Sequence, residues 1–212
     1  MRGIVCVLYS LLICSAIQAG GDVIFLEAEK FDPNLSVIES GGVRWIVKED
    51  PTAFGGKYVT PEGPSLKGAT SLVYRIPKVE KGGGIWKLWV RAIMPKLVDN
   101  PQKGEDVADS FTVQLSVDGG KRWGKKKEVI AGGFSMKWKW VGWEIERLDK
   151  GERNLLKIIE RECGVKLDLF CLRNDGDLPS DEEYRRYLES LSKRQPVDPG
   201  SFLPITWGDI KK

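Results

Sequence analysis

Apolar and polar residues alternate along most of the chain, from residue 23 to about residue 173. The alternation is clearest in residues 85–93 (IWKLWVRAI) and residues 110–117 (SFTVQLSV). Because successive side chains of a β-strand point to opposite faces, a period of two predicts strands that are buried on one face. In these two segments the buried face would carry Trp86, Leu88, Val90, Ala92, Phe111, Val113, Leu115 and Val117.

Further segments of the same kind follow one another, separated by turns rich in Gly and Asp. They are residues 23–28, 44–47, 71–76, 128–131, 138–147, 155–161 and 166–172. Many short strands with such turns are typical of a sandwich or barrel. We therefore expect an all-β domain over residues 22–175. Its later strands should form an antiparallel meander, with alternate turns at opposite ends.

The pattern changes to a helical period after this domain. Residues 179–194 begin with Ser180 and Glu183 at the spacing of a capping box, which predicts an amphipathic helix. Its apolar stripe consists of Tyr184, Tyr187, Leu188 and Leu191. The stripe either packs on the sandwich or contacts a protein partner. Residues 195–212 would form a linker and tail.

The N-terminal segment has the pattern of a signal peptide over residues 1–19. Arg2 precedes an apolar run over residues 3–17, and Ala19 offers a small residue at which cleavage is expected. The run is too short to span a bilayer, which takes about 20 apolar residues. We therefore expect a secreted protein, extracellular or periplasmic, with no membrane span.

Composition excludes several functions. The chain has no His, which removes His-based nucleophilic catalysis and His-ligated metal sites. Its net charge of +3 gives no electrostatic case for nucleic-acid binding. Cys163 and Cys171 lie in a turn and well along the following strand, so we expect two unpaired thiols. Carboxylates are plentiful, but no pair stands out as a glycosidase would require, and we expect no enzyme.

One end of the predicted sandwich gathers aromatic and polar residues. The loops over residues 94–109, 131–137 and 162–165 should meet there, because alternate turns of a meander share an end. Sugars need aromatic faces for stacking together with directional hydrogen-bonding groups, so this end predicts a carbohydrate site. Its candidate residues are Asn100, Asp109, Phe134, Trp138 and Lys166. The alternative is that Trp138 belongs to the core and that the acidic loop is only solvated.

Trp45 and Phe54 form a second candidate platform for a sugar, since they flank a loop that contains Gly. Ordinary packing in strand and turn is the alternative for each of them.

Four segments together resemble the carbohydrate-binding modules of families 6 and 35. They are LEAEKF (residues 26–31), SLVYRIPKVEKGGGIWKLWVRA (71–92), DSFTVQLSVDGGKRW (109–123) and LDKGERNLLKIIERECGVKLDLFCL (148–172). The resemblance implies a galactose-binding-like fold, a jelly-roll β-sandwich with the sugar cleft at the loop end. At the family's frequent Asn position this chain has Lys166.

The resemblance also implies a structural Ca²⁺ ion held by Glu27, Glu29 and Asp168. Oxygen ligands suit Ca²⁺, and the two glutamates share a strand face. The alternative is a pair of surface glutamates beside Lys30.

We therefore expect a non-catalytic module that binds an extracellular polysaccharide or oligosaccharide. The alternative is a structural, adhesion or protein-interaction domain of the cell surface that binds no sugar. Exposure distinguishes the two, because a carbohydrate platform of this kind needs at least two coplanar aromatic rings open to solvent at the loop end.

Overall fold

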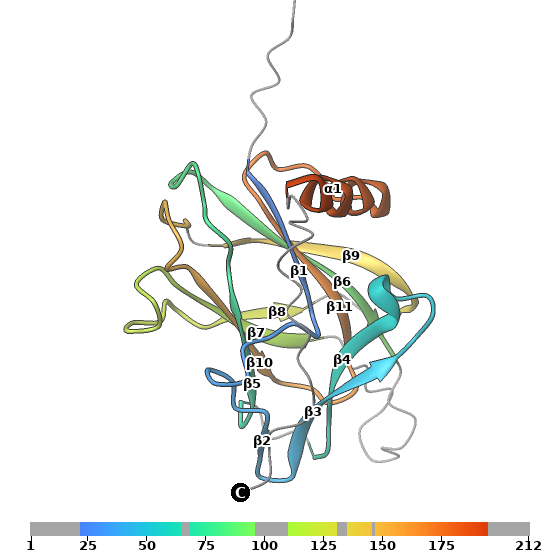
Figure 1. Ribbon diagram of the computed structural model, residues 1–212. Coiled ribbons are helices and arrows are strands. Elements are labelled where there is room, and N and C mark those ends of the chain that lie inside the picture. The colour runs from blue at the N-terminus through green and yellow to red at the C-terminus, as the bar shows by residue number, and fades with distance from the viewer. Residues whose placement is uncertain (1–21, 65–67, 96–109, 131–134, 146, 195–212) are drawn as a thin grey trace, which may run out of the picture.

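The computed structural model shows two antiparallel sheets packed face to face, with one helix against the larger sheet (Figure 1). It describes residues 22–64, 68–95, 110–130, 135–145 and 147–194. The larger sheet has seven strands in the order β2-β3-β4-β11-β6-β9, with β1 paired to β11. Their bounds are β1 Val23–Glu27, β2 Glu39–Ser40, β3 Val43–Glu49, β4 Lys57–Glu62, β6 Trp86–Met94, β9 Ser135–Ile145 and β11 Lys166–Arg173.

The smaller sheet has four strands in the order β5-β10-β7-β8. Their bounds are β5 Ser71–Arg75, β7 Ser110–Ser116, β8 Lys127–Ile130 and β10 Leu155–Glu160. A 3₁₀ turn, η1, spans Phe54–Gly56, and the helix α1 spans Asp181–Arg194. The predicted all-β sandwich with a C-terminal helix is confirmed.

The predicted meander is wrong. From β6 onwards the chain crosses repeatedly between the sheets, with β6, β9 and β11 in the larger sheet and β7, β8 and β10 in the smaller one. Among the described strands from β6 onwards, β7 and β8 are the one pair that are neighbours both in sequence and in a sheet. Each crossing buries the apolar face of a strand against the other sheet, which gives the jelly-roll arrangement. Alternate turns still lie at opposite ends, because neighbouring strands are antiparallel.

The core between the sheets is built from the faces that the alternation predicts. Trp86, Leu88 and Val90 of β6 are fully buried, as is Phe111 of β7 to within 1%. These side chains belong to one continuous apolar cluster that reaches across both sheets. The alternation therefore identified the inward faces of both strands correctly.

Two strands were missed by the sequence pattern, β2 and β4. The segment KYVTPE of β4 contains Pro61, which lacks the backbone N–H that an interior strand needs. The structure accommodates Pro61 because the ladder between β4 and β11 is confined to Val59, opposite Leu167, so no β11 residue requires an N–H from Pro61. The Pro61 carbonyl still accepts from the backbone N–H of Gly164 at 2.8 Å.

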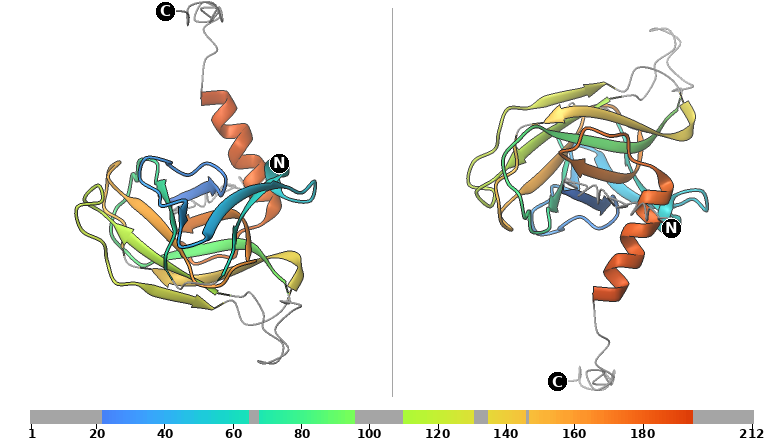
Figure 2. Two further views of the ribbon diagram at one scale, coloured as in Figure 1. Left: turned by 90° about the horizontal axis from the view of Figure 1, so that it is seen from below. Right: turned by 90° about the horizontal axis from the view of Figure 1, so that it is seen from above.

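The outer face of the larger sheet carries a second apolar cluster, which α1 covers. Phe25, Leu169, Cys171 and Tyr184 are buried there. Figure 2 shows α1 starting against the sandwich and running away from it. Packing of the helix on the sandwich is thus confirmed for Tyr184 and for the partly buried Tyr187. Leu188 is 40% exposed, and the side chain of Leu191 lies outside the described part of the chain.

The start of α1 follows one half of the predicted capping box. The backbone N–H of Glu183 donates to Ser180 Oγ at 3.1 Å. The Glu183 carboxylate does not return to the helix start but accepts from Arg173 Nη1 at 2.9 Å. Glu183 therefore ties the helix to the end of β11 (Lys166–Arg173).

Cys163 and Cys171 form no disulfide with one another, as predicted. No helix among the described residues is long and apolar enough to cross a membrane.

Candidate carbohydrate-binding site

The structure brings together two of the residues predicted for the loop-end site, Trp138 and Lys166. Trp138 lies on β9 and Lys166 begins β11, and Tyr58 of β4 lies between them. The Tyr58 ring is 5.9 Å from the Trp138 ring, and Lys166 Nζ is 5.2 Å from the centre of the Tyr58 ring. The other predicted residues of this site, Asn100, Asp109 and Phe134, lie outside the described residues.

Strand register explains this grouping. β4 pairs with β11 in the antiparallel sense at Val59 and Leu167, which makes Tyr58 and Lys166 diagonal neighbours on one face of the sheet. On the other side of β4, Tyr58 is paired with Lys48 of β3. The sequence did not single out Tyr58 as a site residue, because β4 was not recognised as a strand and its neighbours could not be inferred.

The loop between β3 and β4 adds polar groups that the sequence did not single out. Trp138 Nε1 donates to Thr52 Oγ1 at 3.0 Å. The backbone N–H and the hydroxyl of Thr52 both donate to Asp50 Oδ1, at 2.8 and 2.6 Å. These bonds, with the charges of Lys166 and Arg91, lower the pKa of Asp50. Asp50 is therefore an ionised acceptor beside the Trp138 ring at neutral pH.

A hollow of about 360 Å³ adjoins this group. Its lining includes Tyr58, Lys166, Lys48 and Glu62, so aromatic and charged groups converge on one space. A site of this size and mixed lining can hold a small ligand or one part of a long one.

The two aromatic rings do not form a flat platform. The planes of Trp138 and Tyr58 are inclined by 64°, and Tyr58 is only 6% exposed. Trp138 is half-buried, with Arg91 Cζ 5.3 Å from its ring centre. The criterion of two coplanar exposed rings is therefore not met by Trp138 and Tyr58, and stacking at this site would depend on Trp138 alone.

The second predicted platform is corrected by the structure. Trp45 is 3% exposed and belongs to the core between the sheets, because its strand turns that face inwards. Phe54 is half-buried beneath α1, with its ring 4.8 Å from Tyr184 and 4.5 Å from Arg91 Cζ. Packing, the alternative for both residues, describes them correctly.

Asp168 forms a buried ion pair and does not join the predicted calcium ligands. The side chains of Arg91 and Asp168 are 10% and 0% exposed, and Arg91 Nη1 donates to Asp168. The backbone N–H of Phe54 donates to Asp168 Oδ1 at 3.1 Å. Burial raises the pKa of Asp168 to about 6, while the bonds from Arg91 and Phe54 oppose the rise. At neutral pH the carboxylate is thus ionised and already compensated.

Glu27 and Glu29 converge at the end of β1, next to η1. A Cβ atom added to Gly55 would lie 3.5 Å from Glu29 Oε1 and 3.8 Å from Glu27 Oε2, so Gly55 leaves room for both carboxylates. Glu29 Oε2 is buried without a hydrogen-bond partner. Burial, together with the nearby charge of Glu27, raises the pKa of Glu29 to about 7.

These features fit a bound cation, since two carboxylates and an unsatisfied buried oxygen share one space. Lys30 Nζ compensates Glu27 from the solvent side, at 2.9 Å. Across the described ranges no three His, Cys, Asp or Glu side chains gather as metal ligands. The predicted set of three carboxylates is therefore reduced to Glu27 and Glu29.

The fold is similar to solved carbohydrate-binding modules across about 70% of the chain. One is the C-terminal family 6 module of a laminarinase from Zobellia galactanivorans, with 16% identity, coverage of 72% of this chain and 99% of that one, and a TM-score of 0.44. Another is a family 35 module from Clostridium thermocellum, with 17% identity, coverage of 70% and 97%, and a TM-score of 0.45.

A third similar structure is a family 6 module from Clostridium stercorarium solved with cellobiose, with 14% identity, coverage of 69% and 89%, and a TM-score of 0.42. No protein-family model matches the sequence. No curated protein matches it either.

Proposed function

We propose that this chain is a secreted, non-catalytic carbohydrate-binding module and that it binds a polysaccharide or oligosaccharide at the Trp138 end of the larger sheet. The observation that carries the proposal is the partly exposed Trp138 ring, which contacts Tyr58 in the wall of a hollow that is also lined by charged groups. The jelly-roll sandwich and the four sequence segments that resemble families 6 and 35 support it. The apolar run that follows Arg2 supports export.

Trp138 would take the apolar face of one sugar ring. Its indole N–H is already held by Thr52, which fixes the orientation of the ring before a ligand arrives. Asp50 would accept hydrogen bonds from sugar hydroxyls, and Lys166 would donate to them. One stacking ring gives a small contact area, so we expect affinity for a single sugar to be weak and to rise with chain length.

We propose that Ca²⁺, when bound, is held by Glu27 and Glu29. The ion would neutralise two carboxylates that are partly buried next to one another, and so stabilise the seam between β1, η1 and α1. Its contribution would be structural, because the Trp138 group lies on other strands of the sheet.

The test of sugar binding is a glycan array probed with the full chain in the presence of Ca²⁺. We expect neutral glycans to bind, Trp138→Ala to abolish the binding and Trp138→Phe to retain part of it. Trp123→Ala, which removes a half-buried indole from the loop between β7 and β8, is the matched control and should bind as the unaltered chain does. Near-ultraviolet circular dichroism would verify that each variant is folded.

Two outcomes would contradict this function. Equal binding by Trp138→Ala would move the site elsewhere. An empty array from a folded protein would favour the protein-interaction alternative, for which the exposed Leu188 and Leu178 are the residues to substitute.

Calcium binding is tested separately by thermal unfolding. We expect Ca²⁺ to raise the unfolding midpoint of the chain and to leave that of Glu29→Gln unchanged, with the exposed Glu39→Gln as control. A midpoint that Ca²⁺ does not move would remove the ion from the proposal and leave the sugar site intact.

A further inference from the structure

A strongly basic segment lies far from the Trp138 group. Residues 121–127 read KRWGKKK, so five of seven residues are cationic. The segment leads from the end of β7 into β8, which is an edge strand of the smaller sheet. The chain as a whole has a net charge of only +3, so this charge is a local feature.

Most of this charge is not compensated within the protein. Arg122 pairs with Asp118, its Nε atom lying 3.0 Å from Asp118 Oδ2. Within the described residues, Lys125 and Lys126 have no carboxylate partner. Lys157 of β10 adds another ammonium group, placed 3.7 Å from the centre of the Trp123 ring. Burial and the charge of Lys126 lower the pKa of Lys157, which indicates that these ammonium groups repel each other.

The backbone of the segment is held in place. The N–H of Gly124 donates to the carbonyl oxygen of Leu115 at 2.8 Å, and Gln114 Nε2 donates to the carbonyl oxygen of Gly124 at 2.8 Å. Both bonds tie the centre of the segment to β7. The backbone that carries the lysines is therefore ordered before binding, which lowers the conformational-entropy cost of binding a ligand.

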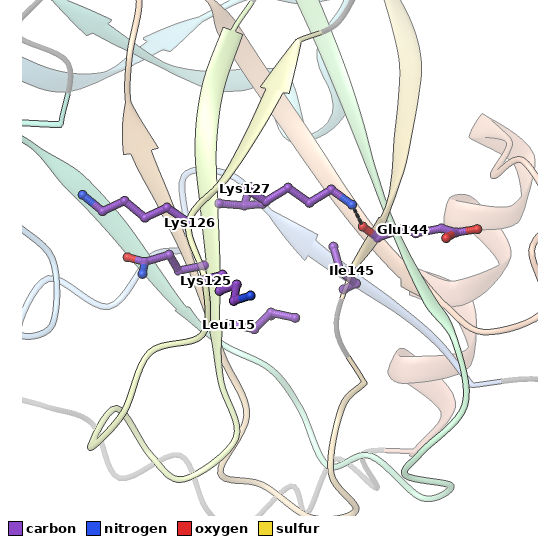
Figure 3. Close-up of a pocket in the computed structure, with 8 residues that line it drawn as sticks. Leu115, Lys125, Lys126, Lys127, Glu144 and Ile145 are labelled. Carbon is purple, nitrogen blue, oxygen red and sulfur yellow. Dashed lines mark hydrogen bonds between the residues drawn. The ribbon is translucent and has the colours of Figure 1, made fainter.

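A cavity of about 410 Å³ opens beside the segment, between β7, β8 and β9. Its apolar floor includes Val113, Leu115 and Ile145, and Lys125 and Lys127 belong to its rim. Figure 3 shows Lys127 reaching across to the backbone carbonyl of Glu144, while the Glu144 carboxylate points away from the lysines. Among the residues that the structure describes, the site thus combines an apolar surface with cationic groups, and the one carboxylate in its lining, that of Glu144, is turned away from them.

We propose that the basic segment of residues 121–127, together with Lys157 and this cavity, binds an acidic polysaccharide. Carboxylate or sulfate groups of the ligand pair with the lysine ammonium groups. An apolar ring face covers the floor of the cavity, whose volume suits one or two sugar rings. This site is independent of the Trp138 site and would serve ligands of a different charge.

An acidic polysaccharide fits the site better than a nucleic acid does. A duplex presents closely spaced phosphates along its whole length and requires an extended basic surface. Here the acidic residues Asp118 and Glu128 flank the basic segment, and the apolar cavity has no role in phosphate binding.

The lysines also have a simpler explanation. Charged residues on an edge strand prevent sheets from pairing edge to edge, and β8 is such a strand. If this were their only role, their removal would cause self-association and would not change binding to a polyanion. The two explanations therefore make different predictions for one variant.

The experiment titrates the full chain with polygalacturonate, which carries carboxylates, and with dextran sulfate, which carries sulfates. Neutral dextran is the uncharged control, and isothermal calorimetry at low and at physiological salt is the measurement. We expect binding to one or both polyanions, weakened by salt because exposed charges are screened. The triple variant Lys125→Gln, Lys126→Gln, Lys127→Gln should bind about tenfold more weakly or worse.

A charge-matched variant separates the site from the net charge. Arg44→Gln, Lys57→Gln and Lys78→Gln together remove the same three charges from exposed positions outside the patch, and this variant should bind as the unaltered chain does. Trp138→Ala should also leave polyanion binding unchanged, which keeps this test distinct from that of the neutral glycan site.

Four results would overturn the proposal. They are unchanged binding by the lysine variant, an equal loss in the charge-matched variant, equal binding of neutral dextran, and tighter binding of a DNA duplex than of either polysaccharide. Self-association of the lysine variant with unchanged polyanion binding, seen by size-exclusion chromatography, would assign the lysines to protection of the sheet edge.

Discussion

The outer faces of the two sheets have opposite character. On the larger sheet, Phe25, Leu169 and Cys171 point outwards and are buried, with α1 packed over them. On the smaller sheet, the outward positions of β7 and β10 carry Gln114 and Lys157, which remain partly exposed. Strands of one sandwich can thus be buried on one face or on both, depending on whether a third layer covers them.

The strand sequences carry this difference. The β11 segment LDLFCL is almost continuously apolar, as strands covered on both faces are, whereas the β7 segment SFTVQLS alternates. The covered face also contains a buried ion pair, Arg91–Asp168, whereas Gln114 and Lys157 on the open face remain partly exposed to solvent. The following substitutions compare the two faces, from the largest expected effect to the smallest.

The largest loss of stability is expected at the buried Arg91–Asp168 ion pair on the covered face of the larger sheet. Asp168→Asn keeps the shape of the side chain but removes the fully buried partner of the Arg91 guanidinium, which is 10% exposed, and leaves it only the partly exposed Asp181 at 3.2 Å. Breaking a buried ion pair from one side destabilises a protein by about 3–5 kcal/mol. Unfolding by urea, followed by circular dichroism, measures the loss.

The control pair lies on the smaller sheet. Arg75 of β5 pairs with Asp32, and its side chain is 67% exposed. Arg75→Ala should cost less than about 1 kcal/mol. Equal losses from the two substitutions would mean that the Arg91–Asp168 pair is not buried in solution.

The next largest loss of stability is expected in the helix α1, which forms the third layer over the larger sheet. Tyr184 is 2% exposed and packs on Phe25 and Phe54, at ring distances of 5.2 and 4.8 Å. Tyr184→Ala should destabilise the protein by about 3 kcal/mol, the lower end for loss of a buried aromatic ring. A dye that fluoresces on apolar surfaces should bind the variant more strongly, because the face beneath α1 opens.

Leu188→Ala supplies the matched control, since Leu188 lies on the same helix and is 40% exposed. Its unfolding midpoint should move much less. If Tyr184→Ala left the unfolding midpoint unchanged, α1 would not cover the sheet in solution.

A smaller effect is expected at Gly142 of β9, which lies opposite Trp89 of β6. A Cβ atom at this position would lie 2.3 Å from the Trp89 ring, so the indole must move. Gly142→Ala should therefore cost about 1–3 kcal/mol as overpacking does. The control is Glu144→Ala, an exposed position on the same face of the same strand, which should change the free energy of unfolding very little in the same urea titration. If Gly142→Ala were as stable as the unaltered chain, the close contact with Trp89 would be contradicted.

Sequence alone predicted the features that depend on local pattern. The inward faces of β6 and β7 and the Ser180 cap follow from residue periodicity and capping chemistry. It also placed Trp138 and Lys166 at the same end of the sandwich, and in the structure both contact Tyr58. This part of the prediction held because alternate turns lie at opposite ends even though the strands cross between the sheets.

The features that were missed depend on register between distant strands. The register of β11 against β6 shifts between Leu167 and Leu169, so that a bulge at Asp168 directs this side chain to Arg91 on the outer face. No local pattern in the sequence predicts this bulge, and the expected grouping of Asp168 with Glu27 and Glu29 rested on the resemblance to the family alone. Trp45 was misplaced for a related reason, because its burial depends on the pairing of β3 with the unrecognised β4.

The smallest expected effect tests how far ionic contacts hold the third layer. Arg173, at the end of β11, is 4% exposed; its Nη2 donates to Asp175 at 2.7 Å and its Nη1 donates to Glu183 of α1. The hydrogen bonds from Arg173 lower the pKa of Asp175 below its usual value of 3.8. The stabilisation by Asp175 is therefore fully present above about pH 4 and is lost as the pH falls through the lowered pKa of the folded state.

We expect the difference in urea midpoint between the unaltered chain and Asp175→Asn to shrink as the pH is lowered from 6 to 3. The amide cannot titrate, so the variant supplies the baseline. A difference that stays constant across this range would mean that the lowered pKa of Asp175 contributes nothing to the attachment of α1. Aromatic packing around Tyr184 would then be sufficient to explain why the larger sheet is covered and the smaller sheet is not.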